Sequence, residues 1–130
     1  WKLYSVNIKN AVAIQTTAGH LYEALDRAPY ITIGKVRYVD YNKWFSSING
    51  AYWYKRKSFE HEWEVRAIIL DHKTTSNGLY IPINIKRLVD CVYISPYAPS
   101  WFEEVVHSII EKYELTCPVV YSEMSKQPFY

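Results

Sequence analysis

Apolar and polar residues follow recognisable periods along most of this chain. Ala11–Thr16 is a short apolar run with β-branched residues, which predicts a strand. Thr17 then has the character of a helix N-cap, and apolar residues at helical spacing continue to Arg27. Tyr30–Asp40 alternates with a period of two but has mixed faces, which predicts a half-exposed strand.

The middle of the chain contains the clearest alternation. Glu62–Leu70 predicts a strand that buries Trp63 on its apolar face. An Asn-Gly pair at residues 77 and 78 is a strong hairpin signal, so Leu79–Ile85 is expected to return as the partner strand. The charged and aromatic segment Tyr52–His61 is expected to form a short helix.

The last third predicts a strand, a helix and a strand. Cys91–Ser95 is expected to be a buried strand, and Ser100 with Glu103 has the spacing of a capping box. Apolar residues then recur at helical spacing, at Phe102, Val105, Val106, Ile109, Ile110 and Tyr113. After a last strand over Cys117–Ser122, the order favours an α+β fold, with two main helices packed on a mixed, largely antiparallel sheet.

Composition narrows the class of protein. The 130 residues fit a single domain, 1–130, and carry a net charge of +2, which disfavours nucleic acid as a partner. The apolar runs are too short to span a membrane. Two isolated cysteines and no signal peptide favour a cytoplasmic protein. Because the chain opens on Trp1 without methionine, we expect a fragment, a processed product or a shortened chain.

The densest chemistry lies between residues 55 and 66. If the predicted strand forms, Glu62, Glu64 and Arg66 share one face. Glu62 and Glu64 are then candidate catalytic residues, as general base or ribose contact, while Arg66, Lys55 and Arg56 are candidate anion contacts. The alternative is a solvated strand face with ordinary ion pairs, which contribute about 0–1 kcal/mol each.

Two further segments are weaker candidates for ligand binding. Trp53 lies in an aromatic and basic stretch, Tyr52–Lys57, of the kind that stacks on bases or contacts phosphates. Ser95 opens the turn between a predicted strand and a predicted helix, where an anion could bind. Inward-packed aromatics and a rigid structural turn are the respective alternatives. The four histidines are scattered, so no metal site is expected.

Several motifs together resemble a family of proteins. They are Trp1-x-x-Tyr4, Lys55-Arg56-x-x-Phe59-x-x-Glu62-x-Glu64-x-Arg66 and a strand ending in Ser95-Pro96. This pattern, covering nearly the whole chain, resembles an uncharacterised bacterial and phage domain-of-unknown-function family. The resemblance implies either the C-terminal portion of a longer member or a shortened member. A bacterial, phage or mobile-element source is expected. The pattern is also similar to the ADP-ribosyltransferase-like fold, which implies that Glu62 or Glu64 orients the ribose of NAD.

Two functions therefore stay open. The first is an enzyme, or a remnant of one, that acts on NAD or another nucleotide through Glu62, Glu64 and Arg66. The second is a non-catalytic binding or protein-interaction module. Its contact surface would be the aromatic stretch of residues 38–54, and a homodimer is one form such a module could take.

Overall fold

The computed structural model describes residues 9–25, 30–43, 48–70 and 78–125. It confirms an α+β fold, with helices and mixed, mostly antiparallel sheets. The chain divides into two compact units, which we call the terminal unit (Trp1–Ala24 with Ile83–Tyr130) and the central unit (Leu25–Pro82). The single domain expected for residues 1–130 stays a prediction.

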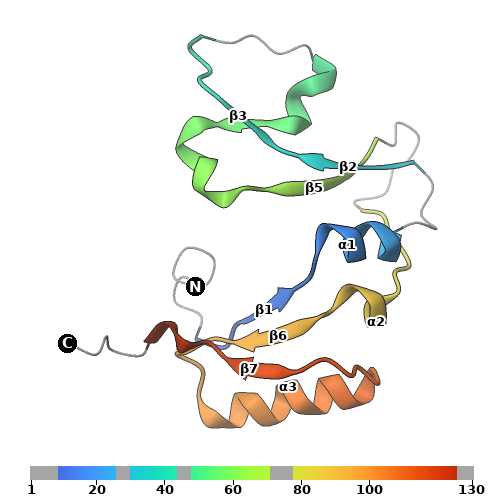
Figure 1. Ribbon diagram of the computed structural model, residues 1–130, viewed down its shortest axis with the longest axis vertical. Coiled ribbons are helices and arrows are strands. Elements are labelled where there is room, and N and C mark those ends of the chain that lie inside the picture. The colour runs from blue at the N-terminus through green and yellow to red at the C-terminus, as the bar shows by residue number, and fades with distance from the viewer. Residues whose placement is uncertain (1–8, 26–29, 44–47, 71–77, 126–130) are drawn as a thin grey trace. The chain divides into compact units, whose positions relative to one another are not determined.

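The terminal unit is built on a three-stranded sheet (Figure 1). Strand β6 (Cys91–Ile94) lies in the middle, antiparallel to β1 (Val12–Gln15) and parallel to β7 (Val119–Tyr121). The predicted strands are therefore confirmed at all three places. The apolar run of β6 is almost entirely buried, as expected for a central strand covered on both sides.

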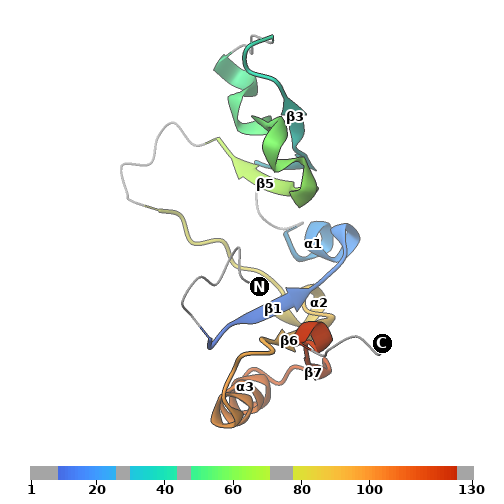
Figure 2. The ribbon, with the colours of Figure 1, turned by 90° about the vertical axis from the view of Figure 1, so that its left-hand side faces the viewer.

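The core of the terminal unit lies between this sheet and helix α3 (Ser100–Lys112), which runs along one face of it (Figure 2). Ile94 is fully buried, and Val106 is the helix residue that packs deepest against it. Phe102 and Ile110 pack at the edge of this core. The rest of the predicted apolar stripe is exposed, namely Val105, Ile109 and Tyr113, because the narrow sheet covers only part of the helix.

The two main helices begin in different ways. Helix α1 (Ala18–Leu25) has the predicted cap, since the Thr17 hydroxyl oxygen accepts the backbone N–H of His20 at 3.1 Å. The capping box predicted for α3 is wrong. Extended Pro99 is its N-cap, with no side-chain cap, so Ser100 is already helical. Glu103 interacts instead with Tyr121 of β7.

Short contacts complete the terminal unit. Helix α2 (Ile85–Leu88) precedes β6 and is capped by Asn84, whose side chain accepts the N–H of Arg87. A 3₁₀ turn, η3 (Glu123–Ser125), follows β7. His20 on α1 contacts Asp90, with 2.8 Å between Nδ1 and the nearer carboxylate oxygen. This pair joins α1 to the residue that precedes β6.

The central unit contains two two-stranded sheets (Figure 1). Strand β2 (Ile31–Lys35) pairs antiparallel with β5 (Val65–Ile69), and β3 (Arg37–Val39) pairs parallel with β4 (Tyr54–Arg56). The single strand expected over Tyr30–Asp40 is thus divided at Val36. The side chain of Val36 is buried, and its N–H donates to the Glu64 carbonyl at 2.9 Å.

Two predictions for the central unit are wrong. The helix expected over Tyr52–His61 is replaced by the end of a 3₁₀ helix η1 (Ile48–Trp53), by β4, and by a second 3₁₀ helix η2 (Lys57–Glu62). Residues 79–84 form no strand, and β5 pairs with β2 instead. Asn77 of the expected hairpin turn lies outside the described residues.

The side chain of Trp63 was also expected in the core, but it is 82% exposed. This residue ends η2 with a left-handed backbone, at φ 46°, so the alternation of β5 starts only after it. The strand periodicity therefore does not include Trp63. For this reason the Trp63 side chain does not pack in the core, contrary to what the alternation predicts.

Because α1 has a side-chain cap and α3 has none, two similar substitutions should change the free energy of unfolding by different amounts. Thr17→Ala removes the capping hydrogen bond of α1 and should lower the free energy of unfolding by about 1 kcal/mol. Ser100→Ala removes no capping contact in α3 and should change it by no more than about 0.5 kcal/mol. Urea denaturation followed by circular dichroism measures both. An equal or larger loss for Ser100→Ala would contradict the assigned caps.

Candidate functional site

The structure brings four of the predicted site residues together in the central unit. Lys55, from β4, lies between the carboxylates of Glu62 and Glu64, and its Nζ is 3.2 Å from Glu64 Oε2. Lys55 also lies 4.8 Å from the ring centroid of Phe59. Arg66, from β5, binds Glu64 from the other side. We call these four residues, Lys55, Glu62, Glu64 and Arg66, the ion-pair network.

Glu64 is the most constrained member of this network. Arg66 donates hydrogen bonds to its carboxylate from two nitrogens, Nε and Nη2, and Nη2 lies 3.1 Å from Oε2. Its backbone N–H donates to the Tyr38 hydroxyl at 2.7 Å, and its carbonyl accepts from Val36. The remaining guanidinium nitrogen of Arg66, Nη1, donates to the Tyr52 carbonyl at 2.6 Å. The network therefore connects β3, β4, β5 and η1.

The charges of the network stabilise one another. The hydrogen bond from Arg66, with a further one from Lys55, lowers the pKa of Glu64 below its usual value. The hydrogen bond to Glu62 is the main cause that raises the pKa of Lys55, and the one to Glu64 raises that of Arg66. A carboxylate with a lowered pKa is a weak proton acceptor, so the geometry suits a structural ion pair better than a general base.

Arg56 belongs to a different face of the same strand. Adjacent residues on a strand point to opposite sides, so Lys55 enters the network while Arg56 points away from it. Among the described residues Arg56 forms no ion pair, and its guanidinium lies 5.8 Å from the ring centroid of Tyr41. A helix over residues 52–61 would have placed Arg56 one turn from Glu60, but the strand β4 replaces it at Arg56.

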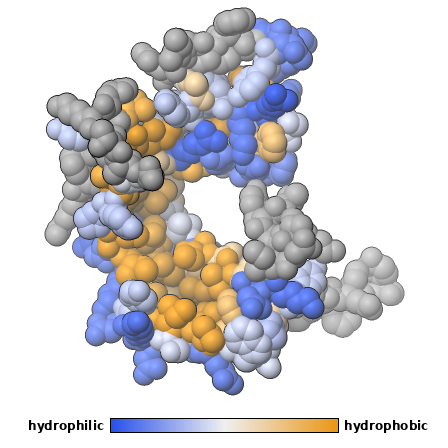
Figure 3. All heavy atoms as spheres, turned by 180° about the vertical axis from the view of Figure 1, so that it is seen from behind, coloured by the Kyte–Doolittle hydropathy of each residue, from blue (hydrophilic) through white to orange (hydrophobic). Residues whose placement is uncertain are grey.

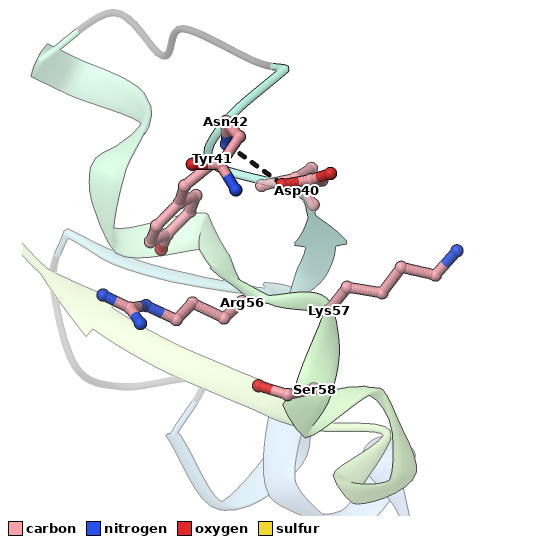
Figure 4. Close-up of a pocket in the computed structure, with 7 residues that line it drawn as sticks. Asp40, Tyr41, Asn42, Arg56, Lys57 and Ser58 are labelled. Carbon is pink, nitrogen blue, oxygen red and sulfur yellow. Dashed lines mark hydrogen bonds between the residues drawn. The ribbon is translucent and has the colours of Figure 1, made fainter.

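A pocket of about 340 Å³ surrounds this Arg56 face (Figure 4). Its lining comes from the end of β3 and the following turn, from the end of β4 and from the start of η2: Val39, Asp40, Tyr41, Asn42, Arg56, Lys57 and Ser58. The Asp40 carboxylate accepts a hydrogen bond from the backbone N–H of Asn42, at 3.0 Å. Arg56 extends toward Tyr41, whereas Lys57 extends in the opposite direction (Figure 4). We call this the Arg56 pocket.

Trp53 lies in a second pocket, of about 530 Å³, which Gly34, Lys35, Arg37 and Tyr54 also line. The ring of Trp53 packs directly on Gly34. A Cβ at that position would lie 2.8 Å from the Trp53 ring carbon Cζ3, so glycine permits this contact. The tryptophan is thus half-buried by a structural contact, and its pocket is separate from the Arg56 pocket.

Ser95 belongs to the terminal unit, whereas the other candidate residues belong to the central unit. Its side chain is fully buried, and its hydroxyl accepts the N–H of Tyr97 at 3.3 Å. The backbone of Ser95 bonds with Ala11 and Ala98. These contacts make Ser95 a turn residue that dissolved ligands do not reach in this structure.

The aromatic residues that were expected to form a contact surface are exposed only in part. Tyr41 and Tyr52 are exposed, while Tyr38, Trp53 and Tyr54 are partly covered. Trp44 and Phe45 lie outside the described residues. The sequence pattern does not indicate that Tyr41, Asn42 and Ser58 share a pocket. They line one with Arg56 because residues 54–56 form a strand beside β3.

Charge is unevenly divided between the two units. The central unit, Leu25–Pro82, has nine Lys and Arg residues against six Asp and Glu, while the terminal unit has six against seven. The small positive charge of the whole chain therefore originates in the unit that holds the Arg56 pocket. Such an excess attracts anions at long range.

In the residues that the structure describes, no group of three or more His, Cys, Asp or Glu side chains is placed to hold a metal ion. None of the described helices is both long and apolar enough to cross a membrane. Comparisons with protein-family models, curated proteins and solved structures find no match. The resemblances noted from the sequence therefore stay predictions.

The lowered pKa of Glu64 predicts how stability depends on pH. Since the folded protein holds the Glu64 proton less tightly than the unfolded chain, ionised Glu64 stabilises the fold above about pH 4.5. This stabilisation is lost as the pH falls through the lower folded value. Glu64→Gln should therefore lower the free energy of unfolding by about 1–2 kcal/mol at pH 6. The loss should be smaller at pH 3, and urea denaturation at the two pH values measures it.

Glu60→Gln provides the control for this experiment, since Glu60 is exposed and forms no ion pair among the described residues. It should change the free energy of unfolding by less than about 0.5 kcal/mol at either pH. A cost for Glu64→Gln that does not shrink on acidification would contradict the structural role of this carboxylate.

Proposed function

We propose that the central unit is a non-catalytic binding unit for a small phosphate-bearing ligand with an aromatic ring, of mononucleotide size, held in the Arg56 pocket. In this proposal Arg56 binds the phosphate and Tyr41 contacts the ring. The ion-pair network is the scaffold that fixes β4 in the orientation that presents Arg56. The predicted anion-binding role of Arg56 is thus kept, while Lys55 and Arg66 are assigned to the scaffold.

The observation that supports the proposal most directly is that two neighbouring cations on β4 have different surroundings. Lys55 is fully engaged with two carboxylates, whereas Arg56 forms no ion pair among the described residues and lies at an open pocket. An arginine beside a tyrosine ring offers a planar set of donors for a phosphate and a surface for a ring. The positive charge of the central unit adds to this preference.

The size of the pocket favours a mononucleotide over NAD. About 340 Å³ is at the small end of the range for small-molecule sites, and most of the lining side chains are exposed. A ligand held on one side by exposed residues binds weakly. We therefore propose a mononucleotide-sized ligand, and give Glu62 and Glu64 no catalytic role.

Calorimetric titration with AMP and with adenosine tests this function. AMP should bind more tightly than adenosine, since only AMP carries the phosphate that Arg56 is proposed to bind. Arg56→Gln should weaken AMP binding by about 5- to 20-fold, corresponding to the loss of one charge-assisted contact of about 1–2 kcal/mol. Tyr41→Leu should weaken both ligands, because it removes the ring surface.

Lys43→Gln is the matched control, because it removes one exposed positive charge of the central unit outside the pocket. It should leave AMP binding within about twofold. The proposal is overturned if wild-type protein fails to bind AMP at millimolar concentration. It is equally overturned if Lys43→Gln weakens binding as much as Arg56→Gln, because the effect would then be general electrostatics.

A further inference from the structure

Strand β1 lies at an edge of the terminal sheet. The order of strands is β1-β6-β7, so β6 occupies one side of β1 and no described residue pairs with the other side. All four residues of β1 are exposed, with Val12 at 44% and Ile14 at 55%. Figure 3 shows that apolar side chains are gathered on the surface of this unit.

The hydrogen bonds to β6 determine which backbone groups face outward. Ser95 donates its N–H to the Ala11 carbonyl, and the register pairs Ala13 with Tyr93. In an antiparallel pair the bonded residues alternate, so residues 11, 13 and 15 bond to β6. The N–H and C=O groups of Val12 and Ile14 therefore point to the outer edge.

Within the described residues, β1 lacks the charge, the proline and the bulge that commonly prevent strand addition at an edge. An open edge strand can pair with a strand of another chain. In natural proteins, charged residues, proline or a bulge in the edge strand commonly prevent this pairing. The sequence Val-Ala-Ile-Gln of β1 contains no charge and no proline, and its register with β6 is continuous. By comparison, β7 at the other edge has three residues and follows Pro118 directly.

We propose that β1 is a homodimer interface, at which β1 of a second copy adds in antiparallel orientation about a two-fold axis at Ala13. The outward-facing N–H and C=O groups of Val12 then form hydrogen bonds with those of Ile14 of the partner subunit. By symmetry, Ile14 bonds in the same way to Val12 of the partner subunit, as an isologous interface requires. Ala13 faces Ala13 of the partner subunit as a non-hydrogen-bonded pair, with Cα atoms about 4.5 Å apart. A small side chain suits this close approach.

The charges near the strand are compatible with self-pairing. Lys9 is the one charged residue between positions 9 and 17, and in this register it lies opposite Thr17 of the partner subunit. No like charges face each other across the axis, which would otherwise destabilise the pairing. Exposed Val12 and Ile14 of the two copies come together on one face of the six-stranded sheet and bury apolar surface.

Substitutions at the axis give a specific test, because Ala13 is exposed and each copy meets itself there. In sedimentation velocity, the wild-type chain should show a monomer–dimer equilibrium between about 10 µM and 1 mM, as expected for a small interface. Ala13→Lys and Ala13→Asp should each be monomeric over this range, since two like charges then face each other. An equimolar mixture of the two should recover the dimer, because the charges become opposite.

Ser108→Lys on α3 is the control, as it adds the same charge at an exposed position outside the interface. It should dimerise like the wild type. The proposal is overturned if the wild-type chain is monomeric throughout, if Ala13→Lys dimerises normally, or if the mixture stays monomeric. A monomeric wild type would leave the ligand proposal intact, because the Arg56 pocket belongs to the central unit.

Discussion

The central unit depends on one ammonium group placed between two carboxylates. Lys55 contacts Glu62 and Glu64, and Arg66 completes the neutralisation of Glu64. These residues come from β4, from the end of η2, and from β5 and the residue before it, so the network joins segments whose sheets are short. Short two-stranded sheets are marginal by themselves, and an ion-pair cluster that also binds Tyr38 and the Tyr52 carbonyl supplies much of their mutual orientation.

The same network explains why neighbouring residues have different roles. With Lys55 held on one side of β4, Arg56 is directed to the other, where Tyr41 and the exposed start of η2 form a pocket. Under the proposed function, a structural charge and a ligand-binding charge are thereby separated within two residues. The excess of positive charge in the central unit and the near balance in the terminal unit fit this division.

Local signals predicted much of the terminal unit. The apolar runs of β1 and β6 and the Thr17 cap each depend on residues close in sequence, so they could be read directly. In the central unit the outcome depends on distant partners. The pairing of β5 with β2, and the conversion of residues 54–56 into a strand beside β3, could not be derived from the alternation of Glu62–Leu70 or the charges after Tyr52. The expected shared strand face of Glu62, Glu64 and Arg66 is wrong, because Glu62 lies in η2, Glu64 precedes β5 and only Arg66 lies in the strand. The three residues are nevertheless close together, because the fold places Lys55 and Arg66 beside the two carboxylates.

The direct test of this account is the ionisation of Glu64, measured by carbon-detected NMR of its side-chain carboxylate during an acid titration. If Arg66 and Lys55 hold the carboxylate as a structural ion pair, its titration midpoint should lie below the usual value of about 4.5. Lys55→Met should move the midpoint upward, because one of the two cations is removed. A midpoint above 4.5 in the wild-type protein would contradict the structural role and return Glu64 to the candidates for acid–base chemistry.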